Sequence, residues 1–269
     1  MSDDYGTRFG GIARLYGDGG LERLRVARVM VIGVGGVGSW VAEALARSGV
    51  GELHLVDLDD ICLTNTNRQL HALSATVGRS KIAVMAERIA AIAPACRVVA
   101  VHDFFTVSNA AELVTPELSW VVDAIDGFRH KCALITRCYD AGVPLVTMGG
   151  AGGRKDPTQV RVDDLAVSQG DRLLHRVRKE LRQKHGFSRT GRWGIPCVYS
   201  AELPVFPTAD GGVCEARDQA DTLRLDCATG FGTASFLTGA FGLAAASVVV
   251  TGLATGAPAL QIHERLASS

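Results

Sequence analysis

The chain has 269 residues, of which 47% are apolar and 21% are charged, a composition that suits one or two globular domains and argues against a disordered chain. Its 28 Lys and Arg residues balance its 28 Asp and Glu residues, so no net charge draws the whole chain to nucleic acid or to an anionic membrane. Seven cysteines without paired spacing, and an N-terminus that lacks an apolar signal core, predict a cytoplasmic protein without structural disulfides.

Residues 1–27 are predicted to form an N-terminal arm or short helix ahead of the first strand. The segment is polar and rich in glycine, and its arginines include Arg8 and Arg14. Arginines in such a position are usually surface charges, but an arm can also reach a phosphate on a neighbouring subunit.

The chain is organised around a glycine-rich turn that follows a β-prone apolar run at residues 29–32. A helical pattern at residues 40–47 comes after the turn. The turn carries Gly33, Gly35, Gly36 and Gly38. A side chain at Gly35 would hold a diphosphate away from the backbone N–H groups, and one at Gly38 would push the helix off the sheet. We therefore predict a nucleotide site here, the alternative being a turn that only packs a helix.

A polar loop follows the second predicted strand, residues 52–56. The strand ends in Asp57, about twenty residues after the glycine turn, where such folds place the acid that binds a ribose. The loop at residues 58–69 then brings further polar side chains to the carboxyl edge of the sheet, beside a phosphate tail laid over the turn. The side chains expected there are Asp59, Asn65, Arg68 and Gln69.

The helix predicted over residues 80–93 has Lys81 in its first turn. A cation in that position opposes the helix dipole. The arrangement makes sense if a phosphate lies in front of the lysine; otherwise Lys81 is an ordinary exposed lysine.

Three further strands are predicted at residues 97–101, 119–125 and 143–148, so residues 28–149 form a doubly wound, Rossmann-like α/β sheet. Asp123 and Asp126 lie at the carboxyl end of the fourth strand, where ligands bind in such sheets. One of them is expected to hold Mg²⁺ on the phosphates, and the other to cap the next helix.

Residues 150–269 are predicted to extend the same globular unit with strands and helices that complete a mixed sheet. Residues 149–154 are rich in glycine and are expected to form a hinge or a crossover loop. Residues 172–192 contain eight Lys or Arg residues and a single acidic residue, Glu180. This segment is either a solvated face or a groove for a nucleic-acid backbone, whose binding would depend on salt.

Residues 228–262 contain no Asp, Glu, Lys or Arg. The segment is long enough to cross a bilayer, but its many small residues favour a helix buried against other helices or against a dimer partner. Weak membrane association is the alternative. Residues 258–266 are predicted to form a last strand.

Three cysteines in the second half, Cys197, Cys214 and Cys227, form no CxxC pair, so a zinc site is not expected. We expect them to be buried apolar residues. Cys227, which adjoins a glycine-rich turn, is the first choice for a reactive thiol.

Taken together, the glycine turn, Asp57 with Asp59, the Asn65-x-x-Arg68-Gln69 loop, Lys81 and Asp123-x-x-Asp126 resemble the adenylating domain of the ubiquitin-activating-type (ThiF/MoeB-like) superfamily. Dehydrogenases lack the Asn-x-x-Arg-Gln loop. Within the superfamily, residues 8–17, 64–69, 149–159 and 226–232 are most similar to the tRNA threonylcarbamoyladenosine dehydratases of the TcdA (CsdL) type.

The resemblance implies a homodimer that uses ATP and Mg²⁺ to convert threonylcarbamoyladenosine, next to the anticodon of tRNA, to its cyclic form by adenylating the threonyl carboxylate. It implies that Asp57 binds the ATP ribose, that Arg68 and Lys81 bind the phosphates, that Asn65 lies at the phosphate end, and that Asp126 binds the metal. Arg68, Lys81 and Asp126 are therefore the implied catalytic residues. Gly11 replaces an arginine of the sulfur-carrier branch, which leaves open whether Arg8 or Arg14 reaches the partner's ATP.

Other functions remain open at this point. One is an adenylating enzyme for a sulfur-carrier or ubiquitin-like protein, with Cys197 or Cys227 taking the acyl group. Another is a sulfur-relay adaptor without catalysis that docks on a cysteine desulfurase. A nicotinamide oxidoreductase would leave Arg68 and Lys81 without a role.

Overall fold

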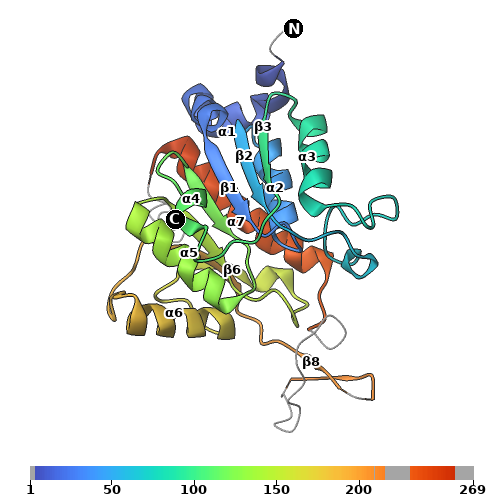
Figure 1. Cartoon of the computed structure of the whole chain (residues 1–269), viewed down its shortest axis with the longest axis vertical. Coiled ribbons are helices and arrows are strands. Elements are labelled where there is room, and N and C mark those ends of the chain that lie inside the picture. The colour runs from blue at the N-terminus through green and yellow to red at the C-terminus, as the bar shows by residue number, and fades with distance from the viewer. Residues whose placement is uncertain (1–3, 209, 216–230, 258–269) are drawn as a thin grey trace.

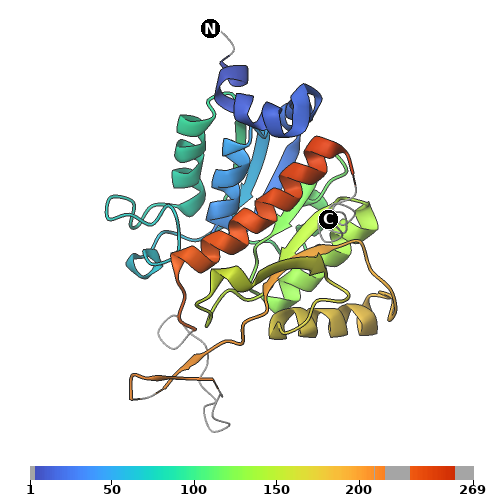
Figure 2. The same ribbon diagram turned by 180° about the vertical axis from the view of Figure 1, so that it is seen from behind.

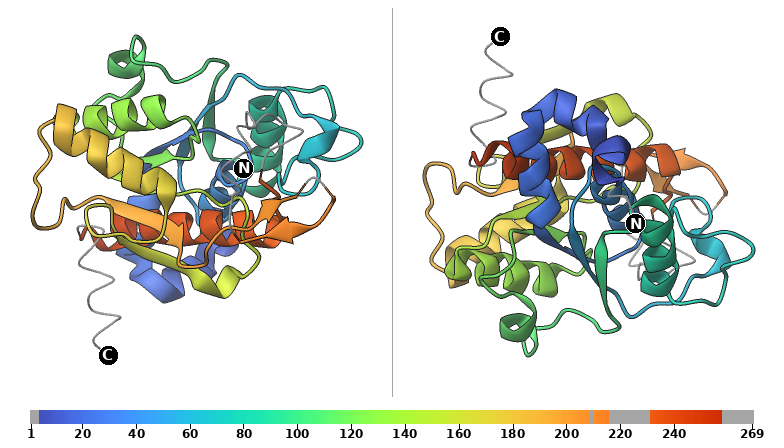
Figure 3. Two further views of the ribbon diagram at one scale, coloured as in Figure 1. Left: turned by 90° about the horizontal axis from the view of Figure 1, so that it is seen from below. Right: turned by 90° about the horizontal axis from the view of Figure 1, so that it is seen from above.

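The computed structural model describes residues 4–208, 210–215 and 231–257. Within these residues the main body is a seven-stranded sheet with helices on both faces (Figures 1 and 3). The strands are β1 (Arg28–Ile32), β2 (Glu52–Val56), β3 (Arg97–Val101), β4 (Trp120–Asp123), β5 (Leu145–Met148), β6 (Val160–Asp164) and β7 (Pro196–Ser200). The helices are α1 (Tyr5–Val26), α2 (Gly38–Arg47), α3 (Lys81–Ile92), α4 (Ala110–Leu113), α5 (Phe128–Ala141), α6 (Arg172–Lys184) and α7 (Ser235–Thr255).

Strand order in the sheet is β3-β2-β1-β4-β5-β7-β6, and every pair is parallel except β6 with β7. This confirms the predicted doubly wound mixed sheet. The order reverses between β1 and β4, and ligands of such sheets bind at the carboxyl ends of the strands at that point. Ile32 of β1 pairs with Val56 of β2 on one side and with Asp123 of β4 on the other, so the residues after these three strands meet at one edge.

Both faces of the sheet are buried, as parallel sheets require. Val29 and Val31 of β1 point to the layer that contains α2, α3 and α7, whereas Met30 and Ile32 point to the layer of α5 and α6. Figure 2 shows α7 running obliquely across its face of the sheet. A short ribbon of β8 (Phe206–Pro207) and β9 (Val213–Cys214) projects from the body (Figure 1).

Helix α1 is longer and better packed than the predicted arm. It spans Tyr5–Val26 and is kinked at Gly17. Gly17 has a φ of 75°, which glycine adopts without steric strain. The Tyr5 hydroxyl donates to the backbone oxygen of Gly49 at 2.6 Å, and Phe9 and Leu24 are buried. The kink explains why the glycine-rich sequence did not look like one long helix.

Helix α7 is long and apolar enough to span a membrane, but 61% of its most apolar 18-residue stretch is buried inside the fold. Its glycines allow close packing: a Cβ at Gly242 would lie 2.8 Å from the backbone oxygen of Val37, and one at Gly252 would lie 2.5 Å from the Trp120 ring. The uncharged composition is therefore that of a core helix. The predicted strand at residues 258–266 lies outside the described residues, as does Cys227.

Candidate nucleotide site

The glycine turn between β1 and α2 packs directly on the loop after β4. Gly33 has φ of +87°, and a Cβ there would lie 2.8 Å from the backbone oxygen of Ala124. A Cβ at Gly38 would lie 1.8 Å from the oxygen of Gly33, so α2 can approach the strand only with glycine. At Gly35, in contrast, the nearest atom would be 3.7 Å away, on Gln69. The fold itself does not require glycine at position 35, which fits a turn that leaves room for a ligand.

Three charged side chains meet at the end of β2. The Lys81 ammonium lies 2.6 Å from the Asp59 carboxylate and 3.8 Å from that of Asp57, and Lys81 is only 5% exposed. Asp57 also accepts hydrogen bonds from the backbone N–H of Val34 at 2.7 Å and of Asp59 at 2.9 Å. The alternative of an exposed lysine is wrong. Lys81 is buried, and its immediate partners are the two acids that the same motif supplies.

Arg68 lies at the rim of the turn, and its hydrogen-bond partners among the described residues are uncharged. Its guanidinium donates to the backbone oxygen of Thr64 at 2.8 Å and to the Asn67 amide oxygen at 3.0 Å. Neither acceptor is a carboxylate, and no ion pair of Arg68 occurs within the described part of the chain. Trp40 fixes the backbone oxygen of Arg68 with its indole N–H at 3.2 Å. The result is a half-buried cation on a fixed backbone.

Asn65 and Gln69 differ in what they do. Asn65 is buried at the end of a short 3₁₀ helix (Leu63–Asn65), and its side-chain oxygen accepts from the Cys62 N–H at 3.0 Å, so it holds the loop. Gln69 is also buried, but its side-chain oxygen has no hydrogen-bond partner among the described residues. Buried polar atoms are rarely left unpaired. A hydroxyl or amino group of a bound nucleotide would supply the missing donor.

Asp123 and Asp126 have separate roles. Asp123 is fully buried, and its carboxylate lies 2.7 Å from the Lys131 ammonium and 2.6 Å from the Thr147 hydroxyl. It also accepts from the N–H of Ile125 at 3.1 Å. Asp123 therefore has a structural role in this buried cluster, and its predicted contact with a bound nucleotide stays a prediction.

Asp126 lies three residues further on, in the exposed loop between β4 and α5. No hydrogen bond or ion pair of its carboxylate occurs within residues 4–208, 210–215 and 231–257. Those residues also contain no group of three metal-binding side chains. Asp126 therefore offers a single carboxylate to a cation, and that fits Mg²⁺, which is commonly held by one or two carboxylates together with phosphate oxygens.

His71 is a member of the site that the sequence reasoning missed. It is 1% exposed, and its Nε2 lies 2.7 Å from the backbone oxygen of Val34 in the glycine turn. Its Nδ1 has no partner among the described residues. Burial lowers the pKa of His71, and the positive charge of Lys81 lowers the pKa further. No motif marks His71, because its role depends on a contact across 37 residues.

We expect His71 to make the protein lose stability as the pH falls below about 6.5, the usual histidine pKa. The unfolded chain then takes up a proton that the folded chain resists, which favours unfolding. In His71→Gln this part of the pH dependence should disappear. Urea unfolding between pH 7.5 and about 5 measures it, and parallel profiles for the two proteins would contradict the expectation.

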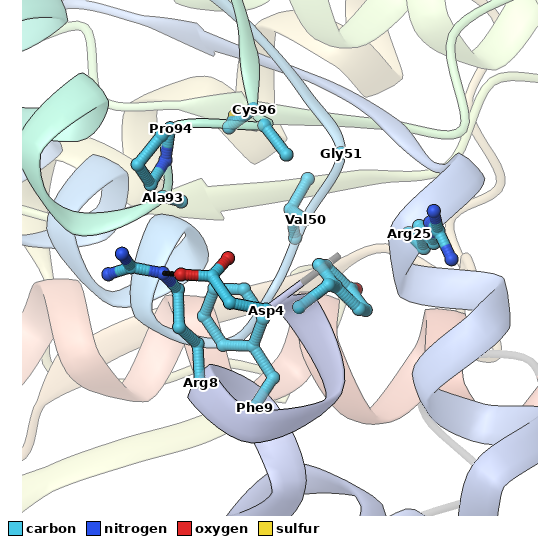
Figure 4. Close-up of a pocket in the computed structure, with 11 residues that line it drawn as sticks. Asp4, Arg8, Phe9, Arg25, Val50, Gly51, Ala93, Pro94 and Cys96 are labelled. Carbon is cyan, nitrogen blue, oxygen red and sulfur yellow. Dashed lines mark hydrogen bonds and ion pairs between the residues drawn. The ribbon is translucent and has the colours of Figure 1, made fainter. Parts of the chain in front are cut away.

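The N-terminal arginines lie far from the glycine turn. Helix α1 packs at the amino edge of the sheet, where Arg8 and Arg25 line a cavity of about 170 Å³ (Figure 4). Arg8 pairs with Asp4 at 2.7 Å and donates to the backbone oxygen of Ile92. Arg14 is exposed on the same helix. That Arg8 or Arg14 reaches a nucleotide bound by a partner subunit therefore stays a prediction.

The described cysteines of the core are poor nucleophiles. Burial raises the pKa of the Cys197 and Cys138 thiols to about 12, and that of Cys132 to about 11. The reactive form of cysteine is the thiolate, so these groups are unreactive near neutral pH. This argues against Cys197 as an acyl acceptor.

The basic segment of residues 172–192 is partly structural. Arg178 is buried and donates to the Ser168 hydroxyl at 2.5 Å, and Arg192 pairs with Asp163 at 3.0 Å. Other cations of the segment remain on the surface, Lys179 and Arg189 among them. The positive charge that this segment presents to solvent is therefore smaller than its count of eight Lys and Arg residues suggests.

Known proteins are similar to this chain in sequence and in overall fold. A family model described as the ThiF family matches residues 10–266. The chain is 49% identical over 250 residues to the tRNA threonylcarbamoyladenosine dehydratase of Escherichia coli K12, with 92% of this chain and 93% of that protein covered. A crystal structure of the E. coli enzyme TcdA in complex with ATP superposes with a TM-score of 0.84 at 44% identity, covering 95% of this chain and 97% of that one. A complex of TcdA with AMP gives a TM-score of 0.83 at 44% identity, with the same coverage.

Proposed function

This chain belongs to the ThiF family, and from that premise we propose that it is an ATP-dependent, adenylate-forming tRNA-modifying enzyme that dehydrates threonylcarbamoyladenosine in tRNA to a cyclic product. The main support is the 49% identity to a tRNA threonylcarbamoyladenosine dehydratase over nearly the full length of both chains. ATP and AMP complexes of TcdA support the same nucleotide here. A tRNA substrate also agrees with the predicted cytoplasmic location.

In this proposal ATP lies over the glycine turn, with its ribose toward Asp57 and its phosphates toward Arg68 and Lys81. The positive charges of Arg68 and Lys81 support this placement of the phosphates. Arg68 has only neutral acceptors around it among the described residues, and Lys81 is a cation that the Asp57 and Asp59 carboxylates hold beside the turn. The oxygen of Gln69, which lacks a donor within the described residues, supports a nucleotide hydroxyl or amino group close to Gly35.

Asp126 is the residue that we assign to Mg²⁺. Its support is an exposed carboxylate in the loop after β4, beside the turn that packs on Ala124. A metal ion held there would neutralise negative charge on the diphosphate.

The chemistry follows from the poor reactivity of a carboxylate, whose negative charge repels nucleophiles. One oxygen of the threonyl carboxylate attacks the α-phosphorus of ATP, and the bond to diphosphate breaks. An atom of the same modified base then attacks the activated acyl carbon, loses its proton, and expels AMP together with the original carboxylate oxygen. The elements of water are lost in this way: the oxygen leaves as part of AMP, one proton leaves the attacking atom, and the second proton left when the carboxyl group ionised.

Neither step requires a protein nucleophile. Adenylyl transfer depends mainly on positioning and on stabilising charge at the leaving oxygens, the role given to Arg68 and Lys81. Ring closure is intramolecular, and a high effective molarity can supply several kcal/mol of the barrier. The unreactive Cys197 thiol supports this reading over transfer of an acyl group to the protein.

A homodimer is part of the proposal. Helix α7 exposes the apolar side chains of Phe236 and Leu243 at 57% and 53%, and a second protein surface would cover them. The extensive burial of the rest of α7 favours protein contact over a membrane as the reason for its uncharged sequence.

We further propose that the outward cations of residues 172–192 contact the phosphates of tRNA. Lys179→Gln with Arg189→Gln should then weaken tRNA binding and reduce the slope of log affinity against log salt by about one to two. Arg97→Gln, which removes an exposed charge at the far side of the sheet, is the control. If the wild type, the double variant and the Arg97→Gln control bind tRNA equally well, the tRNA contacts another surface.

The proposed activity is tested by incubating the protein with ATP, Mg²⁺ and tRNA that carries threonylcarbamoyladenosine. We expect nucleoside mass spectrometry to show the loss of one water molecule, with consumption of ATP in equal amount. Unmodified tRNA is the control. Nucleotide binding without turnover would point to an adaptor, and transfer of an acyl group to a carrier protein would point to the sulfur-carrier branch.

A further inference from the structure

We propose that residues 258–269 of this chain dock in an apolar pocket at the amino-terminal edge of the sheet, opposite the nucleotide site. The pocket has a volume of about 540 Å³. Its walls are the first residues of β4 and β5, the C-terminal ends of α5 and α7, and the loop before β7. None of these elements contributes a side chain of this pocket to the proposed reaction, so the pocket needs its own explanation.

The described walls of the pocket are aromatic and aliphatic, and no charged side chain lines them. Trp120, Tyr139 and Trp193 provide the aromatic surface, and Leu253 of α7 adds to the aliphatic part. Tyr139 is 58% exposed although Phe187 packs against its ring at 4.7 Å. Without a cation, the walls do not suit a phosphate or a nucleotide. They suit apolar side chains, which gain free energy when they leave water.

The chain itself delivers such side chains to the pocket. Helix α7 ends at Thr255 and is capped by Gly256, which has φ of +68°; Gly256 and Ala257 are part of the pocket wall. The next residue, Pro258, must therefore begin at the pocket. The segment that follows carries three aliphatic side chains, Leu260, Ile262 and Leu266. A chain extends by at most about 3.6 Å per residue, so the first two lie within about 20 Å of Ala257.

Tethering favours this occupant over any free ligand. A segment linked by a few residues meets its site at an effective concentration in the millimolar range. Weak apolar contacts are then enough to fill the pocket. The short connection from Ala257 also favours the segment's own chain over that of a second copy.

The test is a pair of full-length variants. Leu260→Asp with Ile262→Asp places charges on the docking side chains, whereas Gln261→Asp with Ser268→Asp adds the same charge elsewhere in the segment. We expect the first variant to lower the thermal unfolding midpoint by about 4 °C or more, the effect of two aliphatic side chains lost from a buried site. The second variant should leave the midpoint unchanged.

A second experiment tests whether the free segment binds to the pocket of this variant. A peptide of residues 258–269, titrated into the Leu260→Asp/Ile262→Asp protein, should change tryptophan fluorescence and saturate, because Trp120 and Trp193 line the pocket. A peptide that carries the same two aspartates should not. The proposal is overturned if both charge variants unfold at the wild-type midpoint and neither peptide changes the fluorescence. It is also overturned if the destabilisation depends on protein concentration, since a second copy would then supply the segment.

Discussion

Asp126→Ala is expected to reduce ATP-dependent cyclisation by roughly 10²-fold or more, the usual cost of removing one preorganised group that stabilises transition-state charge. Asp126 is an exposed carboxylate in the loop after β4, and the described residues contain no group of three metal-binding side chains that could hold Mg²⁺ without it. Binding of modified tRNA should survive, because the loop contributes a single charge. Turnover with saturating ATP, together with filter binding of tRNA, measures the two effects separately.

The matched control is Asp140→Ala. Asp140 is an exposed acid near the other end of α5, so its removal changes the net charge by the same amount away from the turn. The variant should retain wild-type activity. Normal turnover in Asp126→Ala would exclude Asp126 from the site, and the family resemblance would then not extend to this residue.

Lys131→Met is expected to lower the free energy of unfolding by about 3–5 kcal/mol, the cost of leaving one partner of a buried ion pair uncompensated. Lys131 and Asp123 are both fully buried, 2.7 Å apart. The loss of Lys131 strands the Asp123 charge between β4 and β5, where the Thr147 hydroxyl and the Ile125 N–H are the donors that remain among the described residues. Urea unfolding monitored by circular dichroism gives the value.

The double variant Asp123→Asn with Lys131→Met separates charge from packing. The amide introduced at position 123 would be neutral and could still accept a hydrogen bond, so the double variant should be more stable than Lys131→Met alone. Lys184→Met, on the exposed side of α6, controls for the loss of a lysine. Strictly additive effects of the two substitutions would mean that the charges do not interact.

The sequence alone predicted the part of the fold whose signals are local. Short stretches of sequence carry the signals for the glycine turn, for the apolar strands β1 to β5 and for the acid after β2. The alternation of these strands with helices predicted a doubly wound sheet, and the strand order comes from the structure. Lys81 was assigned from its place in a first helical turn, and it lies beside Asp57 and Asp59.

The features that were missed depend on contacts between distant elements. Asp123 looks like a ligand in the sequence, and only the packing of α5 on β4 brings Lys131 to it. His71 carries no motif and reaches the turn through Val34. Arg178 counts as surface charge in the sequence, but the structure buries it against Ser168. Composition does not reveal which cation of a basic run faces inward.

The central step of the proposed reaction is activation of the threonyl carboxylate by transfer of an adenylyl group from ATP bound over the glycine turn. The most direct measurement uses tRNA in which that carboxylate carries ¹⁸O. The account predicts that AMP recovered after one turnover contains one ¹⁸O atom and that the diphosphate contains none. Recovery of the label in inorganic phosphate, with ADP as the nucleotide product, would show phosphorylation instead and would contradict it.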